Sequence, residues 1–249
     1  MKQLREKIIR AAHQAGEGHI PSALSILDIL WVLYFDILKI DVKNPEAEER
    51  DRFILSKGHA SLGLYAILAA KGILPEEALA DFCEYDSCLG GHPDRNKVPG
   101  VEASTGSLAH GFPMAVGVAL GLKIKQSPAR VVTLIGDGEC NEGAVWESAL
   151  LAAHHQLNNL TCVVDYNHST DRALELGDLV EKFAAFGWLA VGIDGHNQEQ
   201  IKQALLLKDP LRPLAIIAAT IKGRGIKSME NNPAWHHKAP NDEIGRAHV

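Results

Sequence analysis

Two oxygen-bearing side chains each follow a run of apolar residues. Asp137 comes directly after the run at 131–135 and lies between two glycines. Asn167 closely follows a second run at 160–165. Because a helical pattern at 142–154 connects the runs, the two predicted strands are parallel and end side by side, at the edge where open α/β sheets bind ligands. A carboxylate and an amide oxygen, beside glycines that let a phosphate approach the backbone, suit Mg²⁺ that carries a diphosphate.

Three other interpretations of this segment compete with a metal site. A generic Asp-Gly turn with a structural asparagine is the simplest of them. A Rossmann dinucleotide site needs three glycines in one turn, and the segment from Gly136 to Asn141 lacks the third. The sequence also contains no Walker-type loop that ends in Lys-Ser or Lys-Thr. Since the Asp137 carboxylate would repel a phosphate without a cation between them, the segment favours a metal-bridged diphosphate.

Composition and charge exclude several classes of function. The 249 residues are 46% hydrophobic and 22% charged, which is typical of one large globular domain or two small ones. A net charge of −6 argues against nucleic acid as the main partner, and no apolar run is long enough to span a bilayer. The charged N-terminus has no apolar signal-peptide core, so we expect a cytoplasmic protein without a membrane partner.

The four cysteines are scattered along the chain, which is typical of reduced cytosolic thiols. Cys83 and Cys88 together with His92 imitate a zinc knuckle, but their spacing matches no common zinc pattern.

Predicted strands and helices alternate along the chain. Strands are expected at 52–55, 131–135, 160–165, 188–193 and 214–219. Helices are expected at 4–15, 25–38, 60–71, 111–125, 142–154, 179–186 and 197–207, with a further helical turn beginning at 75. This alternation predicts an α/β fold, a parallel sheet with helices on both faces, within a single domain over 1–249.

Local signals refine these elements. Ser25 is expected to begin the second helix, with Asp28 completing a capping box, and Asn197 to cap the last helix. The helix at 111–125 is so apolar that it should be buried on most sides. The long segment at 87–105, rich in glycine and proline, is expected to be a functional loop.

Eight short motifs occur in a fixed order along residues 4–243. They are Gly18-His19, Ser56-Lys57-Gly58-His59-Ala60, Gly91-His92-Pro93, the run from Pro99 to Leu108, Gly136-Asp137-Gly138 with Glu142-Gly143, Asp165-Tyr166-Asn167, Lys222-Gly223-Arg224-Gly225, and the run from Asn231 to His236. Together they resemble the diphosphate-binding half of the transketolases, which are thiamine diphosphate enzymes. The resemblance is strongest to the split form, in which two polypeptides make up the enzyme. It implies a thiamine diphosphate-binding fold and the transfer of a two-carbon ketol unit from a ketose phosphate to an aldose phosphate.

The resemblance also implies a role for each matching residue. The Mg²⁺ ligands would be Asp137, Asn167 and the backbone carbonyl of Ser169. The contacts to thiamine diphosphate would come from Ser22, His59, Gly138 and Lys222, with Gly106, Ser107 and Leu108 at its aminopyrimidine end. The residues facing the sugar would be His19, His92 and His236. Glu142 and Glu147 resemble the acidic residues that face the partner subunit near the paired active sites. Glu142 would also take part in catalysis and cofactor binding, and His236 and Asn167 would contact the cofactor as well.

Histidine suits the proton transfers of ketose cleavage, because its ordinary pKa lies near neutral pH. His19, His59, His92 and His236 lie in or beside glycine-rich turns, where a side chain can point into a cleft. A histidine elsewhere is more often a surface or structural residue. We interpret six histidines in this way: His13, His154, His155, His168, His237 and His248.

Four segments depart from the usual family pattern. The family commonly has Pro-Gly where Ile20-Pro21 stands, Gly-Gln-Gly where Ala109-His110-Gly111 stands, and glycine where His237 stands. The segment from His168 to Arg172 differs most, and it follows the predicted metal ligand Asn167. These changes are expected to affect sugar specificity more than metal binding.

The resemblance further implies partners. The family glutamate that protonates the cofactor ring belongs to the other half of the enzyme, and this chain ends at Val249 directly after the matching region. We therefore expect it to require a companion C-terminal transketolase subunit, to pair with a second copy of itself, and to act on sugar phosphates. Helices 111–125 and 142–154 would be covered by that companion and by the second copy. Two alternatives stay open: a non-catalytic binding protein that retains the fold, and a related thiamine diphosphate enzyme for a rarer sugar phosphate, with a deoxyxylulose phosphate synthase less favoured.

Overall fold

The computed structural model describes residues 1–45, 47–240 and 244, and within them five parallel strands form one sheet. The strands are β1 (Arg52–Leu55), β2 (Val131–Gly136), β3 (Leu160–Tyr166), β4 (Leu189–Asp194) and β5 (Leu214–Ala219). Their spatial order is β1-β2-β3-β5-β4. The C-terminal ends of β2 and β3 are adjacent, since Gly136 pairs with Asp165. The residues that follow these strands therefore share one edge of the sheet.

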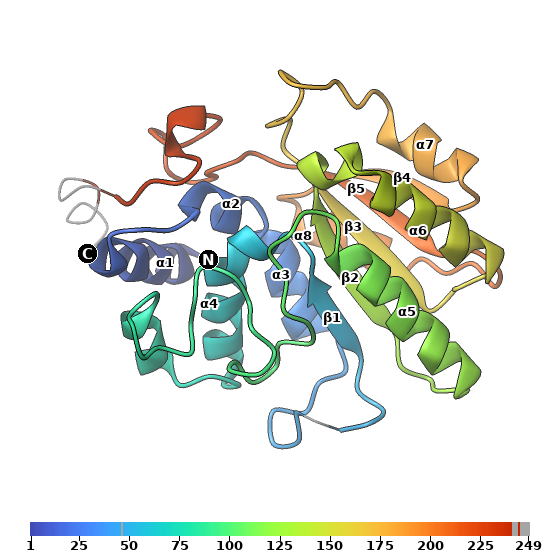
Figure 1. Cartoon of the computed structure of the whole chain (residues 1–249), viewed down its shortest axis with the longest axis horizontal. Coiled ribbons are helices and arrows are strands. Elements are labelled where there is room, and N and C mark those ends of the chain that lie inside the picture. The colour runs from blue at the N-terminus through green and yellow to red at the C-terminus, as the bar shows by residue number, and fades with distance from the viewer. Residues whose placement is uncertain (46, 241–243, 245–249) are drawn as a thin grey trace.

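Helices cover both faces of the sheet, as the alternating pattern predicts (Figure 1). One face carries α5 (Gly111–Ile124), α6 (Gly143–His154) and α7 (Leu179–Ala185). The other carries α1 (Lys2–Ala15), α2 (Ile20–Ser25), α3 (Leu27–Val32), α4 (Ser61–Lys71) and α8 (Gln198–Leu205). Shorter helical turns lie at Leu33–Ile37, Gly58–Ala60, Glu76–Asp81, Asp137–Asn141 and Pro233–Trp235.

Alternate residues of each central strand enter two separate cores. Val132 and Leu134 of β2 pack with α1–α4 and α8, whereas Val131 and Ile135 pack with α5–α7. Because strand side chains alternate between faces, a strand buried on both sides reads as a continuous apolar run. This explains why residues 131–135 show no polar alternation.

The structure contradicts one predicted helix boundary. Ser25 is the last residue of α2, which begins at Ile20, and so it is not the cap of a helix over 25–38. Its hydroxyl donates to the Ser22 carbonyl and, at 2.8 Å, to Asp165 of β3. Asp28 accepts hydrogen bonds from His196 and Gln198 instead of closing a capping box. Partners distant in sequence compete for these side chains, and no local pattern reveals them.

Most other predicted elements are confirmed to within a few residues. Asn197 caps α8, and its side chain accepts hydrogen bonds from the amides of Glu199 and Gln200. The turn after Pro75 is a 3₁₀ helix. No helix in the described part of the chain is long and apolar enough to cross a membrane.

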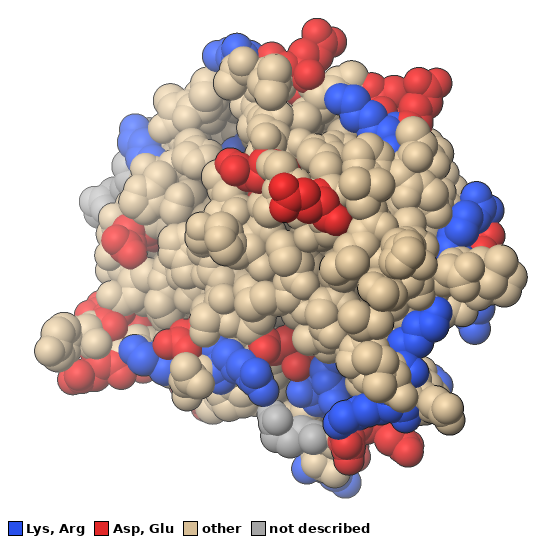
Figure 2. Space-filling model, turned by 45° about the vertical axis from the view of Figure 1, so that its right-hand side comes forward, with Lys and Arg blue, Asp and Glu red and all other residues tan. Residues whose placement is uncertain are grey.

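Helix α5 is less buried than its composition predicts. Met114 and Val118 are 38% and 37% exposed, and an added Cβ at Gly117 or Gly121 would meet no atom within 4 Å. Leu150 and Leu151 of the neighbouring α6 are also exposed. Figure 2 brings this side forward and shows an area whose centre has no basic and few acidic side chains. The prediction of burial on most sides therefore does not hold for the single chain.

Candidate functional site

The predicted metal ligands meet at the C-terminal edge of β2 and β3. The backbone N–H of Ser169 donates to Asp137 Oδ2 at 3.0 Å and to Asn167 Oδ1 at 3.2 Å. Both oxygens therefore lie within hydrogen-bonding distance of one donor. It is the amide of Ser169 that contacts the pair, whereas the predicted ligand is its carbonyl, so that part of the assignment stays a prediction.

A buried carboxylate orients Asn167. Asp165, the penultimate residue of β3, accepts a 2.9 Å hydrogen bond from Asn167 Nδ2. With its nitrogen committed to Asp165, the Asn167 amide presents its oxygen to the Ser169 N–H, which Asp137 also accepts. Asp165 also contacts Lys57 in an ion pair whose side chains are 3% and 0% exposed. Burial opposes ionisation of Asp165, but the Lys57 ammonium and the hydrogen bonds hold its pKa below the ordinary value.

The pKa of Asp137 is shifted in the opposite direction from that of Asp165. Burial and the neighbouring Asp165 carboxylate raise the pKa of Asp137, although Lys57 and the Gly138 and Ser169 amides oppose the rise. A buried carboxylate of this kind gains from a cation, and hard cations take carboxylate and amide oxygens. No group of three or more histidine, cysteine, aspartate or glutamate side chains among the described residues could hold a metal ion, so a site here depends on Asn167 and backbone or ligand oxygens.

Glu139 joins the loops around the site, and the sequence analysis missed it. It is fully buried and accepts hydrogen bonds from Ser56 Oγ at 2.5 Å, Gly136 N at 2.7 Å and Ala109 N at 2.9 Å. These donors come from the loop after β1, the end of β2 and the loop before α5. Glu139 lies two residues after Asp137, yet only the tertiary contacts reveal its role.

Three predicted histidines gather around the fourth, His19. The ring centroid of His19 lies 5.1 Å from that of His59, 5.4 Å from His236 and 6.3 Å from His92. Gly106 belongs to the same group, because an added Cβ there would lie 3.0 Å from the His92 ring. Histidines from four segments that are distant in the sequence are thus brought together.

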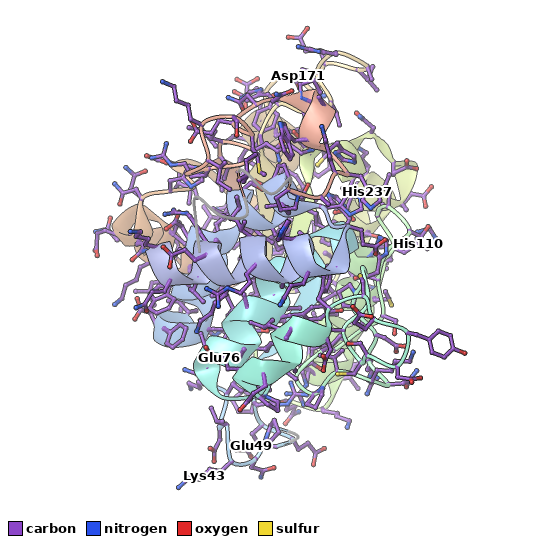
Figure 3. The ribbon with its side chains drawn as sticks, turned by 90° about the vertical axis from the view of Figure 1, so that its left-hand side faces the viewer. Lys43, Glu49, Glu76, His110, Asp171 and His237 are labelled. Atoms are coloured by element: carbon purple, nitrogen blue, oxygen red, sulfur yellow. The ribbon has the colours of Figure 1, made fainter. Side chains whose placement is uncertain are left out.

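His237 also lies beside this cluster, although it is exposed, as its interpretation as a surface residue predicts. Its ring centroid is 4.4 Å from that of His19, closer than any of the predicted partners of His19. Figure 3 shows His237 at the same edge of the molecule as His110, which precedes α5. Among the other five, His168 contacts Asp171, His13 contacts the Pro240 carbonyl, and His248 lies outside the described residues.

His19 and His59 are held in the neutral form. Burial, followed by nearby His237, His236, His92 and Lys222, lowers the pKa of His19 from 6.5 to about 4. Burial and Lys57 lower the pKa of His59 to about 2. Neutral imidazoles can accept hydrogen bonds or protons from sugar hydroxyls.

These pKa values predict a loss of stability in mild acid. Because the folded-state pKa of His19 lies below the ordinary 6.5, the unfolded chain binds protons first as the pH falls. The stability contributed by neutral His19 is complete above pH 6.5 and declines toward pH 4. We expect His19→Asn to flatten the dependence of unfolding free energy on pH in this window. Urea unfolding at a series of pH values measures it. An equal flattening in exposed His154→Asn would contradict the assignment.

Lys222 contacts the histidine cluster and lines the same cavity as the predicted metal ligand Asn167. Its side chain is 9% exposed, and its ammonium lies 3.0 Å from His236 Nδ1. Burial and Lys57 lower the pKa of Lys222 to about 8. A cavity of about 480 Å³ lies beside these groups and is lined by Asn167, His168, Ser169, Thr170, Arg172, Thr220, Lys222, Asn231, Asn232, Pro233 and His236. A larger groove of 760 Å³ between α1 and residues 76–81 contains no predicted site residue.

Two buried hydroxyls at this site have no hydrogen-bond partner among the described residues. They are Ser22 Oγ, which is fully buried, and Thr170 Oγ1, which belongs to a residue lining the cavity. Buried hydroxyls are normally hydrogen-bonded, so both are suited to a polar ligand. The Thr170 methyl group lies only 3.0 Å from the position of a Cβ added to Gly138, so this methyl covers the glycine predicted to face a diphosphate.

The structure does not bring every predicted residue into this cluster. Glu142 is exposed at the N-cap of α6, and Glu147 is also exposed on that helix. Ser107 and Leu108 are exposed in the loop before α5. All four therefore lie open to solvent in the single chain.

Comparison with known proteins identifies the family to which the chain belongs. The family described as "Transketolase, thiamine diphosphate binding domain" matches residues 1–247. The chain belongs to this family. A 6-deoxy-6-sulfo-D-fructose transketolase subunit from Clostridium sp. (strain MSTE9) is 38% identical, over 99% of this chain and 92% of that protein. An apulose-4-phosphate transketolase subunit from Actinobacillus succinogenes is 40% identical, over 98% of this chain and 91% of that protein.

Solved transketolases share the fold. The crystal structure from Campylobacter jejuni superposes with a TM-score of 0.90 at 32% identity, over 97% of this chain and 40% of that one. The Homo sapiens transketolase is 38% identical, and the match covers 95% of this chain and 38% of that protein. This transketolase-type subunit thus matches the short relatives nearly end to end and spans about two fifths of the long ones.

Proposed function

We propose that this transketolase-type subunit binds thiamine diphosphate through Mg²⁺ held by Asp137, Asn167 and the Ser169 carbonyl. The observation that carries the proposal is the shared Ser169 N–H, which holds the two side-chain oxygens together at the sheet edge. The raised pKa of Asp137 supports a cation there, because burial and Asp165 disfavour an unpaired carboxylate. When bound, thiamine diphosphate supplies the reactive carbon for ketose cleavage.

The remaining predicted residues receive roles that match their positions. Lys222, Ser22, Gly138 and His59 would contact the cofactor beside the cavity, with Gly106, Ser107 and Leu108 at its aminopyrimidine end. The exposed Glu142 would complete the cofactor site only in an assembly. His19, His92 and His236 would exchange protons with substrate hydroxyls. An anionic ligand beside them would raise the lowered pKa values of His19 and His236 toward neutrality, where an imidazole is an effective acid and base.

We further propose that the reaction is ketol transfer between sugar phosphates and requires a companion chain. The Clostridium and Actinobacillus relatives are both named as transketolase subunits, which supports a split enzyme, and the sugars in their names support a substrate outside the common pentose phosphates. We place the protein in the cytoplasm, where its four free cysteines would stay reduced. A single domain over 1–249 stays a prediction, because nine of these residues lie outside the described part.

The direct test is titration calorimetry with thiamine diphosphate, in Mg²⁺ and in a chelator. Binding that requires Mg²⁺ is expected. The chain is then combined with a companion C-terminal transketolase subunit and assayed against a panel of ketose phosphates. Mg²⁺-dependent binding without turnover of any ketose by the pair would favour the non-catalytic alternative, which the altered segment from His168 to Arg172 supports.

The exposed face of α5 and α6 predicts self-association. Val118 is 37% exposed in an area that also contains Met114, Leu150 and Leu151, and an uncovered apolar patch of this kind marks an interface. We expect Val118→Asp to shift a dimer to monomer in sedimentation experiments. Leu211→Asp alters a side chain that is 55% exposed in the loop before β5 and should leave the dimer intact. Monomeric wild-type protein at micromolar concentration would contradict this interface.

A further inference from the structure

A buried imidazole outside the proposed site holds the segment that carries Lys222. His196 follows β4, and its Nε2 accepts a 2.9 Å hydrogen bond from the backbone N–H of Ile221. Its Nδ1 lies 3.1 Å from Asp28 Oδ2, and both side chains are 9% exposed. The imidazole therefore connects α3 to the segment that immediately follows β5.

These contacts determine which nitrogen of His196 carries the proton. A backbone N–H can only donate, so Nε2 must present its lone pair to Ile221. Nδ1 then carries the hydrogen that Asp28 accepts. Asp28 is held in turn by Gln198 Nε2 at 3.2 Å and lies 4.0 Å from Arg5. Burial opposes ionisation of Asp28, but its hydrogen bonds from His196 and Gln198 hold its pKa below the ordinary value.

The neighbours of Ile221 are held in the same way. The Thr220 hydroxyl donates to Asp165, and the Gly223 amide donates to the Pro21 carbonyl at 2.9 Å. The loop after β4 packs tightly here, since a Cβ added to Gly195 would lie 2.4 Å from Thr220 Cγ2. Ile221 is the residue directly before Lys222, so the direction of the Lys222 side chain depends on the Ile221 peptide.

We propose that His196, held by Asp28, is a positioning residue that aims Lys222 at the diphosphate of the ligand. The ligand class rests on the proposed function, in which Lys222 contacts a diphosphate. The imidazole acts through the Ile221 peptide and touches neither ligand nor reacting atoms. Its loss should release the segment, let the Lys222 ammonium reach solvent and weaken its contact with a diphosphate.

The test is a double-mutant cycle between His196→Leu and Lys222→Met, read as the dissociation constant for thiamine diphosphate with Mg²⁺. We expect His196→Leu to weaken binding about tenfold, as for other residues that orient a ligand-binding group. In the Lys222→Met background the same change should have little further effect, because residues acting through one contact are not additive. Additive losses would overturn the proposal. His196→Gln, which keeps an oxygen for the Ile221 amide, should restore most of the affinity.

A second readout needs no ligand. The pKa of Lys222, about 8 in the folded chain, can be followed by ¹³C NMR of the lysine side chains and assigned with Lys222→Met. In His196→Leu it should rise toward the ordinary 10.5, whereas exposed His154→Leu should leave it unchanged. If His196→Leu fails to fold, Asp28→Asn carries the same prediction with a smaller rise. An unmoved Lys222 pKa in a folded variant would refute the positioning role. Absence of thiamine diphosphate binding by the wild type would refute the proposed function alone.

Discussion

Replacement of Asp137 by asparagine is expected to reduce Mg²⁺-dependent affinity for thiamine diphosphate by about a hundredfold or more, because a neutral amide replaces the anionic ligand of a hard cation. The unliganded variant should be as stable as the wild type or more so. The Asp137 carboxylate has a raised pKa, from burial and from Asp165, so its ionised form destabilises the folded state above its ordinary pKa. Asp137→Asn should therefore weaken ligand binding without lowering the stability of the unliganded protein.

Calorimetry and thermal unfolding, each with and without Mg²⁺ and ligand, measure both effects. Glu175→Gln provides the control, since Glu175 is an exposed carboxylate in the loop that follows the site. It should retain ligand affinity and the ligand-induced rise in melting temperature. Full retention of that rise in Asp137→Asn would show that the cation binds elsewhere.

Replacement of Lys57 by methionine is expected to lower the free energy of unfolding by about 3–5 kcal/mol, because it leaves a buried charge uncompensated. Asp165 is fully buried and contacts the Lys57 ammonium directly. The hydrogen bonds from Ser25 and Asn167 would remain, but without a cation they cannot offset the cost of burying the carboxylate. Urea denaturation at pH 7 measures the change.

Two further variants test whether the loss of stability comes from the unpaired charge of buried Asp165. Lys57→Met combined with Asp165→Asn should recover part of the loss, since no unpaired charge remains. Lys125→Met breaks an ion pair with Glu48 whose side chains are 69% and 86% exposed, and it should change stability by less than about 1 kcal/mol. Equal losses from Lys57→Met and Lys125→Met would contradict the buried-pair interpretation.

The order of elements and the shared edge of Asp137 and Asn167 could be predicted from sequence because both depend on local patterns. Continuous apolar runs identify strands buried on both faces, and Asp137 and Asn167 stand closely after two of them. Parallel connection then requires these residues to share an edge. The motif order also identified the transketolase family, which the comparisons confirm.

Other parts of the site depend on contacts that no local pattern encodes. Ser25 resembled a helix cap, but its hydroxyl binds Asp165, which lies 140 residues away in the chain. His237 is exposed, as expected of a surface histidine, yet loop packing also places its ring against His19. A stronger distant partner overrides a local preference of about 1 kcal/mol, such as a cap.

The sequence by itself therefore determined the α/β class, the parallel sheet and the identity of the candidate ligands, because strand periodicity and glycine placement act over a few residues. Tertiary structure alone decided which loops Glu139 joins and how His196 reaches Ile221. These choices depend on hydrogen bonds between segments that meet only after the sheet has formed, and burial makes each such bond selective because an unpaired polar group there is costly.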